Sequence, residues 1–134
     1  MNTFTSTQQT TLRAAIDRII PPDQFPGGWA AGVGDYLARQ FAGDLAERVE
    51  QYQSGLDALD DAAVRLHTAP FATLLTATQD ELLGQIEAGE QGDQLARFFT
   101  LLVTHTMEGY YGDPDNGGNR NAVAWQMIGF EVRG

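Results

Sequence analysis

A regular spacing of apolar residues in the middle of the chain constrains the fold more than any other feature. Between residues 45 and 66, these residues recur at alternating steps of four and three. A mean period of 3.5 residues places them along one side of a single long helix. The members of this seam are Leu45, Val49, Tyr52, Leu56, Leu59, Ala63 and Leu66.

The seam is compatible with two kinds of packing. Heptads of this type can form a coiled-coil dimer, and the same face can pack at about 20° against other helices of one chain. Gly55 lies inside the helix and other apolar segments are available to cover the seam, so an intramolecular bundle is favoured. The pair Asp60-Asp61 leaves open a break that would give two helices instead of one.

The first part of the chain predicts two shorter helices joined by a compact turn. Residues 1–11 are rich in threonine and are expected to form a loose arm. A helix then begins near Leu12 and must end at Pro21-Pro22, because proline lacks the N–H of the helical ladder. A second helix is expected over Trp29–Phe41. Its apolar side consists of Val33, Leu37 and Phe41.

Glycines and capping residues mark the limits of the following helices. Gly43 is expected to end the second helix, and Asp44 is a suitable N-cap for the long central one. Further along, Thr76 and Gln79 match the capping box that opens a helix, and Gly89 suits its C-terminal end.

The last long helix is expected to be central. Asp93 can cap it, and it runs from Gln94 to about Tyr110 with an FFTLLV core that is apolar on nearly every side. No segment shows strand-like alternation. The chain is therefore predicted to be all-α, a compact single domain over residues 12–134. We expect about five to six helices, with a long Gly/Asp/Asn loop before a short C-terminal helix.

Composition and charge limit the chemistry. The absence of cysteine excludes disulfides, thiol catalysis and Cys-ligated metals. No segment approaches the ~20 apolar residues of a membrane helix. The net charge of −10 is concentrated in residues 41–93, where eleven acids face two arginines, while both ends are nearly neutral. Nucleic acid is therefore not an expected partner, because phosphate binding needs clusters of basic residues. Direct insertion into a membrane is not expected either, because no segment is long and apolar enough.

Two possible metal sites are incomplete. His105 and Glu108 are spaced i, i+3 on the last long helix, but a carboxylate-bridged site needs further ligands on facing helices. The stretch from Asp113 to Asn119 resembles the start of a calcium loop, yet the twelfth position, where such a loop needs Glu, is Ala124. An EF-hand is therefore rejected and a metal site at His105 and Glu108 is not favoured, so no metal ligands, catalytic residues or cofactor-binding residues are assigned to this chain.

The same stretch is rich in residues that suit recognition. Its glycines permit unusual backbone conformations, and Tyr110, Tyr111, Arg120 and Trp125 are types enriched in interface hot spots. Two roles stay open at this point. The stretch can contact a partner, or it can cap the helical bundle, and both can hold at once.

Two blocks of sequence resemble the gluconate 2-dehydrogenase subunit 3 family, the small subunits of bacterial flavin-dependent sugar and sugar-acid dehydrogenases. The first is LRAAIDRIIPPDQFPGGWAAGVGDYL at Leu12–Leu37. The second is HTMEGYYGDPDNGGNRNAVAWQMIGF at His105–Phe130, in which the run from Glu108 to Trp125 is distinctive.

The resemblance implies a non-catalytic small subunit within a hetero-oligomer. Its partner would be a large, FAD-bearing oxidoreductase subunit of the glucose-methanol-choline type. FAD is thus expected in the partner and no cofactor in this chain. Family members often carry a twin-arginine export signal, which is not seen in MNTFTSTQQTTLRAAI. We therefore expect a cytoplasmic location, with a periplasmic one as the alternative.

We expect the partner to contact the turn over residues 21–29 and the loop over residues 108–125. Two alternatives remain: a stand-alone metal-binding domain centred on His105, Glu108 and Asp113, and a homodimeric scaffold that uses the seam. The predicted contact residues are Pro22, Phe25, Trp29, Glu108, Tyr110, Tyr111, Asp113, Asn116, Gly117, Gly118, Asn119, Arg120 and Trp125.

Overall fold

The computed structural model describes residues 3–22 and 26–112, and within these ranges every regular element of secondary structure is a helix. The all-α prediction is confirmed. The expected long loop and short C-terminal helix lie outside the described residues. The helices are α1 (Ser6–Ile19), α2 (Val33–Phe41), α3 (Val49–His67), α4 (Thr76–Glu87) and α5 (Asp93–Tyr111), with 3-10 turns at Ala46–Arg48 and Phe71–Thr73.

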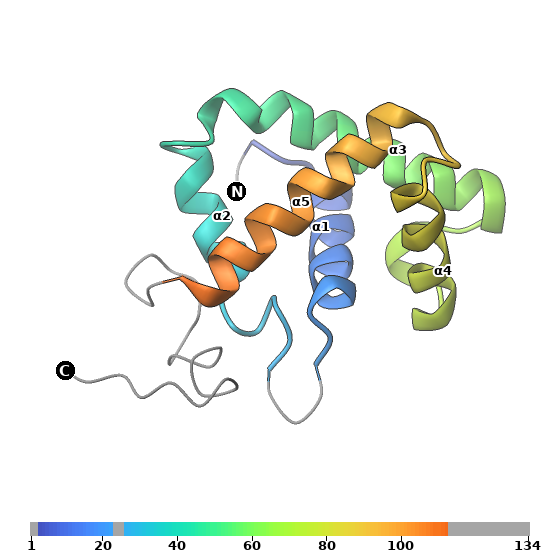
Figure 1. Cartoon of the computed structure of the whole chain (residues 1–134), viewed down its shortest axis with the longest axis horizontal. Coiled ribbons are helices and arrows are strands. Elements are labelled where there is room, and N and C mark those ends of the chain that lie inside the picture. Colours follow the sequence, from blue (N-terminus) through green and yellow to red (C-terminus); the bar gives the residue numbers. More distant parts are fainter. Residues whose placement is uncertain (1–2, 23–25, 113–134) are drawn as a thin grey trace.

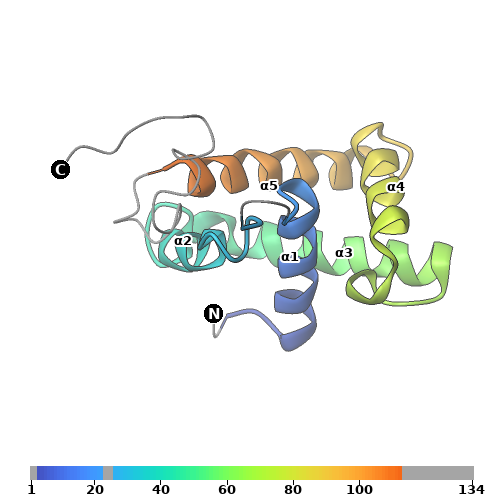
Figure 2. The same ribbon diagram turned by 90° about the horizontal axis from the view of Figure 1, so that it is seen from below.

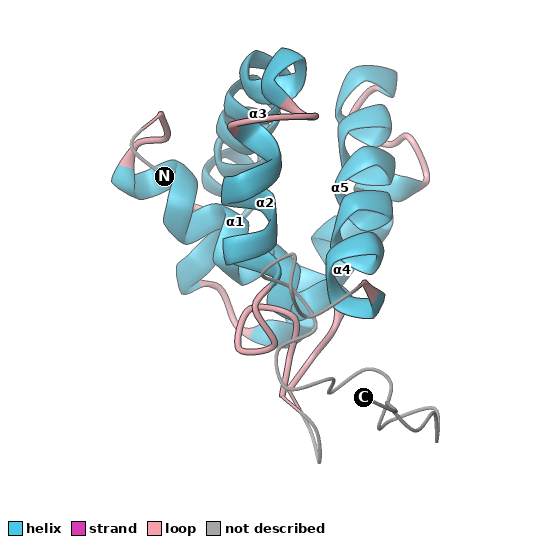
Figure 3. Cartoon of the chain, turned by 90° about the vertical axis from the view of Figure 1, so that its left-hand side faces the viewer, coloured by secondary structure: helices cyan, strands magenta, loops and turns pink. Residues whose placement is uncertain are grey.

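The two longest helices, α3 and α5, organise the bundle. They lie side by side, run in opposite directions and have 19 residues each (Figures 1 and 2). α1 packs against both, while α2 contacts the C-terminal part of α5 and α4 lies near its N-terminal part (Figure 1). Figure 3 shows no strand among the described residues. No helix among the described residues combines the length and apolarity needed to span a bilayer.

The seam faces the interior of the bundle, so the intramolecular arrangement is confirmed. Its central members are buried, and only Leu66 is largely exposed, at 41%. A seam covered in this way is not available for a coiled-coil dimer, and the homodimeric alternative based on it is wrong. The central buried members are Tyr52, Leu56, Leu59 and Ala63.

No break occurs at the acidic pair Asp60-Asp61, because α3 is continuous through it. The side chain of Asp60 instead accepts a hydrogen bond from the backbone N–H of Phe71 at 2.9 Å. This bond fixes the 3-10 turn that follows α3. The acidic residue therefore stabilises the next turn without disturbing its own helix.

Gly55 lets α3 and α5 approach each other closely. A Cβ atom at this position would overlap the ring of Phe98, which lies against the α3 backbone. The Phe98 ring also meets Tyr52 edge-on, with 5.3 Å between ring centroids. Glycine inside a helix costs about 1 kcal/mol relative to alanine, and this close packing offsets that cost.

The N-terminal arm is shorter than the sequence predicted. α1 begins at Ser6 because Thr5 and Gln8 form a complete capping box, with Gln8 N–H donating to Thr5 Oγ1 at 3.0 Å. The preceding Phe4 is buried and its ring lies 5.1 Å from that of Phe41. A loose arm over residues 1–11 is therefore wrong for the described residues from Phe4 onward.

Three predicted helix starts also differ from the structure. α2 begins at Val33 instead of Trp29, because Gly32 has a φ of 101° and is its N-cap. Asp44 lies in a turn ahead of a 3-10 segment and caps nothing. The amide of Gln79 donates to the carbonyl of Phe71 at 2.8 Å, so it does not form the predicted capping box.

Two predicted C-terminal ends are confirmed. α1 ends at Ile19, just before Pro21-Pro22. Gly89 follows the C-cap of α4 with a φ of 83°, a left-handed conformation that favours glycine. Phe98, Phe99 and Leu102 of α5 are buried as expected. The helix is not enclosed on every side, however, because Thr100, Thr104 and Met107 are exposed.

Replacement of Gly55 tests the contact between α3 and α5. Gly55→Ala is expected to lower the free energy of unfolding by about 1–3 kcal/mol, because the added methyl group overpacks against Phe98. Gly84→Ala on α4 is the matched control, since nothing lies within 4 Å of its added Cβ. Its helix propensity predicts a gain of up to about 1 kcal/mol. Equal effects of both substitutions in denaturant titrations would contradict this packing.

Candidate docking site

The two segments predicted to contact a partner meet at one end of the bundle. The hydroxyl of Tyr110 donates to the carbonyl of Pro26 at 3.2 Å, across 84 positions of sequence. Figure 1 shows the C-terminal end of α5 beside the turn that leads into α2. We call residues 26–32 and 107–112 together the paired end. The fold therefore joins parts of both sequence blocks into one surface.

The turn over residues 26–32 is anchored on α1. The backbone N–H of Gly28 donates to the Ile20 carbonyl at 2.9 Å, and that of Trp29 donates to Asp17 Oδ1 at 3.1 Å. The guanidinium of Arg13 lies over the Trp29 ring, 5.7 Å from its centroid. These contacts hold Trp29 half-buried at the surface. The turn thus has a defined conformation next to α5.

Tyr36 joins the paired end to α2 and was not predicted. An added Cβ at Gly109 would lie 2.7 Å from the Tyr36 ring, so this glycine lets α2 and α5 approach closely. Burial, together with the negative charges of Glu108 and Asp44, raises the pKa of Tyr36. The phenol is therefore protonated at neutral pH. The sequence signal for this contact was Gly109, a small residue in the last turn of an otherwise bulky helix.

The described contact residues divide into exposed and buried groups. Pro22, Glu108 and Tyr111 are exposed, and Tyr111 is 43% accessible. Tyr110 is completely buried, so we correct its predicted role from partner contact to an anchor of the turn. The other predicted contacts lie outside the described residues: Phe25, Asp113, Asn116, Gly117, Gly118, Asn119, Arg120 and Trp125.

His105 forms a buried pair with Tyr52. The Tyr52 hydroxyl lies 2.7 Å from His105 Nδ1, and the two rings stack 13° from parallel. Burial lowers the pKa of His105 and raises that of Tyr52. These shifts favour a neutral imidazole, in which Nδ1 accepts a hydrogen bond from the Tyr52 hydroxyl. The pair is therefore part of the core between α3 and α5.

The predicted partners for a metal at His105 are not brought together within the described residues. In these ranges, no three His, Asp or Glu side chains are grouped closely enough to hold a metal ion. Glu108 is exposed one turn further along α5, and Asp113 lies outside the described residues. The structure thus places His105 against Tyr52.

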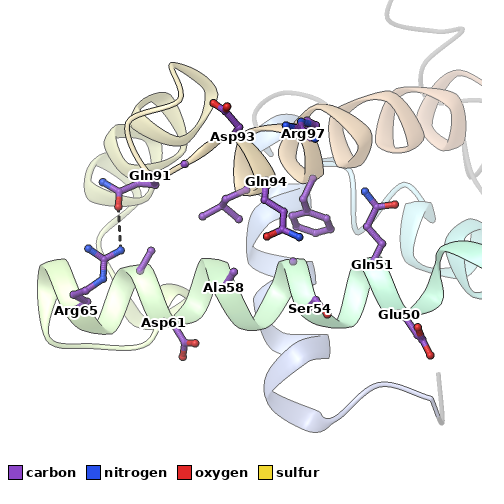
Figure 4. Close-up of a pocket in the computed structure, with 15 residues that line it drawn as sticks. Glu50, Gln51, Ser54, Ala58, Asp61, Arg65, Gln91, Asp93, Gln94 and Arg97 are labelled. Atoms are coloured by element: carbon purple, nitrogen blue, oxygen red, sulfur yellow. Dashed lines mark hydrogen bonds between the residues drawn. The ribbon is translucent and has the colours of Figure 1, made fainter.

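A groove of about 770 Å³ lies between α3 and the N-terminal half of α5, away from the paired end (Figure 4). Gln51 and Gln94 project toward it from opposite walls, and Arg65 donates to Gln91 at 3.0 Å across one end (Figure 4). Gly55 and Phe98 are among the residues that line it. Ser54 lines the groove, but neither histidine does, so these residues form no Ser-His pair.

Comparison with protein families agrees with both sequence blocks. The model of a family described as gluconate 2-dehydrogenase subunit 3 matches residues 6–132. The chain belongs to this family, and the predicted resemblance is confirmed. The family's name is that of a dehydrogenase subunit, which implies a hetero-oligomeric complex with other subunits. No curated protein and no solved structure matches the chain.

Replacement of Tyr110 tests the bond that joins the two segments. Tyr110→Phe is expected to lower the free energy of unfolding by about 0.5–1.5 kcal/mol, because the Pro26 carbonyl loses its donor. Tyr36→Phe is the control, since the described residues provide no hydrogen bond to its hydroxyl. If denaturant titrations give both variants the same stability, the bond to Pro26 contributes nothing.

The buried histidine predicts a pH dependence of stability. Because the pKa of His105 is lowered from its ordinary value of 6.5, the unfolded chain takes up a proton more readily than the folded one. The contribution of the neutral His105 to the free energy of unfolding is complete above pH 6.5. It is lost as the pH falls from 6.5 toward the pKa of His105 in the folded chain. In His105→Asn, whose side-chain oxygen can accept from Tyr52, unfolding free energies should fall less steeply over this window. Identical slopes for both proteins would contradict the assignment.

Proposed function

We propose that this chain is the non-catalytic small subunit of a flavin-dependent dehydrogenase. It binds a large, FAD-bearing subunit of the glucose-methanol-choline type and stabilises or matures it. The large subunit carries the FAD and oxidises a sugar or sugar acid. The match to the subunit 3 family over residues 6–132 is the observation that carries this proposal.

The paired end is the proposed contact with the large subunit. It combines a tethered turn bearing Trp29 with the exposed Tyr111 at the end of α5. Aromatic residues held on rigid elements lose little conformational entropy on binding, and they are enriched in interface hot spots. Arg120 and Trp125, which follow later in the sequence, are also residue types enriched in hot spots. We expect the segment over residues 113–125 to take part in this contact, close to the partner's active site.

The distribution of charge supports this orientation. The acids of α3 and α4 are largely exposed, with Asp61, Asp80 and Glu87 among them. A solvated acidic surface favours solubility, whereas the cores of protein interfaces are depleted of charged residues. We therefore place the α3 and α4 surfaces toward water and the paired end toward the large subunit.

A small subunit can stabilise a larger one if it binds only the folded form of that larger subunit. A partner that binds only the native state raises its stability by mass action, by about 2.7 kcal/mol at a concentration of 100 times Kd. The chain therefore needs no catalytic residue of its own to affect the yield of active enzyme. Its effect would appear as lost flavoprotein when the small subunit is absent.

Co-purification with native subunits tests this function. A tagged chain isolated from its own cells should retain a large subunit with bound FAD and sugar or sugar-acid dehydrogenase activity. The double variant Arg120→Ala, Trp125→Ala should lose that subunit, because hot-spot residues typically contribute about 2 kcal/mol or more each, or about 30-fold in affinity. Glu87→Gln, on the exposed face of α4, is the control and should retain it.

This test distinguishes a wrong function from a wrong position of the interface. If the wild-type chain retains no flavoprotein, the proposed function is wrong. If the double variant retains it as well as Glu87→Gln does, the function stands and the position of the interface is wrong.

A further inference from the structure

An exposed stripe runs along the outer face of α5. Its members are spaced at steps of four, three and four, which places them within one narrow sector of the helix. Met107 and Tyr111 are 37% and 43% exposed, and both threonines of the stripe are exposed as well. We call this set the α5 stripe: Thr100, Thr104, Met107 and Tyr111.

The α5 stripe is less polar than its composition suggests. The hydroxyl of Thr100 donates to the Ala96 carbonyl at 3.1 Å, and that of Thr104 donates to the Thr100 carbonyl at 3.0 Å. Both hydroxyls are thus engaged with the backbone of their own helix, and the methyl groups remain for contact. The stripe itself contains no carboxylate or guanidinium, and the exposed Arg97 and Glu108 of α5 lie beside it.

The remaining exposed helix surfaces differ in charge. Glu50, Asp57 and Asp61 are exposed on α3, and Asp80 and Glu81 are exposed on α4. In a chain with a net charge of −10, an uncharged stripe with exposed Met and Tyr, flanked by single charges, has the composition of an interface core with its rim. Its neutrality therefore distinguishes the stripe from the solvated surfaces of the bundle.

The position of the stripe agrees with its composition. Figure 2 shows α5 along one edge of the molecule, with α1, α2 and α3 on its inner side. The stripe ends at Met107 and Tyr111, which belong to the paired end. It therefore extends that surface along α5 by about two turns toward Thr100.

We propose that the α5 stripe is the apolar core of the interface with the large subunit, and that the paired end is one edge of it. This inference rests on the proposed function. The occupant is an uncharged, apolar surface of the large subunit, bordered by a basic group that can pair with the exposed Glu108 beside the stripe. A second copy of this chain is disfavoured, because two chains with a charge of −10 repel each other.

Cysteine labelling tests this assignment directly, because the chain contains no cysteine of its own. Thr104→Cys is nearly isosteric and places one thiol in the middle of the stripe. Leu75→Cys is the matched control, since Leu75 is the more exposed position, at 78%, and precedes α4. Each variant is treated with a maleimide as the free chain and in the isolated complex, and mass spectrometry follows labelling of the small subunit.

The expected result is position-specific protection. The thiol at position 104 should react rapidly in the free chain and about tenfold or more slowly in the complex, because residues in an interface core are desolvated. The thiol at position 75 should react at the same rate in both samples. As a second variant, Thr104→Glu should weaken association with the large subunit by about tenfold or more, because it buries a charge without a partner.

Other outcomes overturn the proposal in different ways. Rapid labelling at position 104 within an intact complex shows that the stripe faces water, and leaves the proposed function in place. Slow labelling at position 104 in the free chain assigns the stripe to a self-contact or to another part of this chain. If no complex with a flavoprotein forms from the wild-type chain, the proposed function fails first.

Discussion

The packing of α5 against α3 forms the framework on which α1, α2 and α4 pack. Gly55 brings the α3 backbone against the Phe98 ring, and Tyr52 occupies the next position along the same interface. The Tyr52 hydroxyl then pairs with His105 one layer further along α5, at 2.7 Å. Aromatic shape and one buried hydrogen bond thus fix the register of the two longest helices, which a purely aliphatic seam would leave less specific.

This register has a consequence at the C-terminal end of α5. Once Phe98 and His105 are in place, Tyr110 reaches the Pro26 carbonyl and Gly109 lies against Tyr36. Two segments far apart in the sequence therefore form one surface that rests on the core. A rigid surface loses less entropy on binding than separate mobile loops would, which suits a subunit whose proposed task is to bind another protein.

The helical periods were predictable from the sequence because they depend on local spacing, and the seam around Leu56 is buried as its pattern indicated. The start of α1 also depends on local sequence, namely the capping pair Thr5 and Gln8. It was missed because the threonine-rich composition of residues 1–11 favoured a loose arm. The burial of Tyr110 could not be read from the sequence, because it depends on a carbonyl 84 positions away. Composition indicated a recognition surface there, whereas tertiary contacts decide which tyrosine faces outward.

A structure of the chain bound to the subunit that it retains from its own cells would test the account most directly. We expect a large FAD-bearing subunit packed on the outer face of α5 and on the turn over residues 26–32. The acidic faces of α3 and α4 should remain in solvent. A partner that lacks a flavin, or one that binds across the acidic faces and leaves Met107 and Tyr111 exposed, would contradict the account.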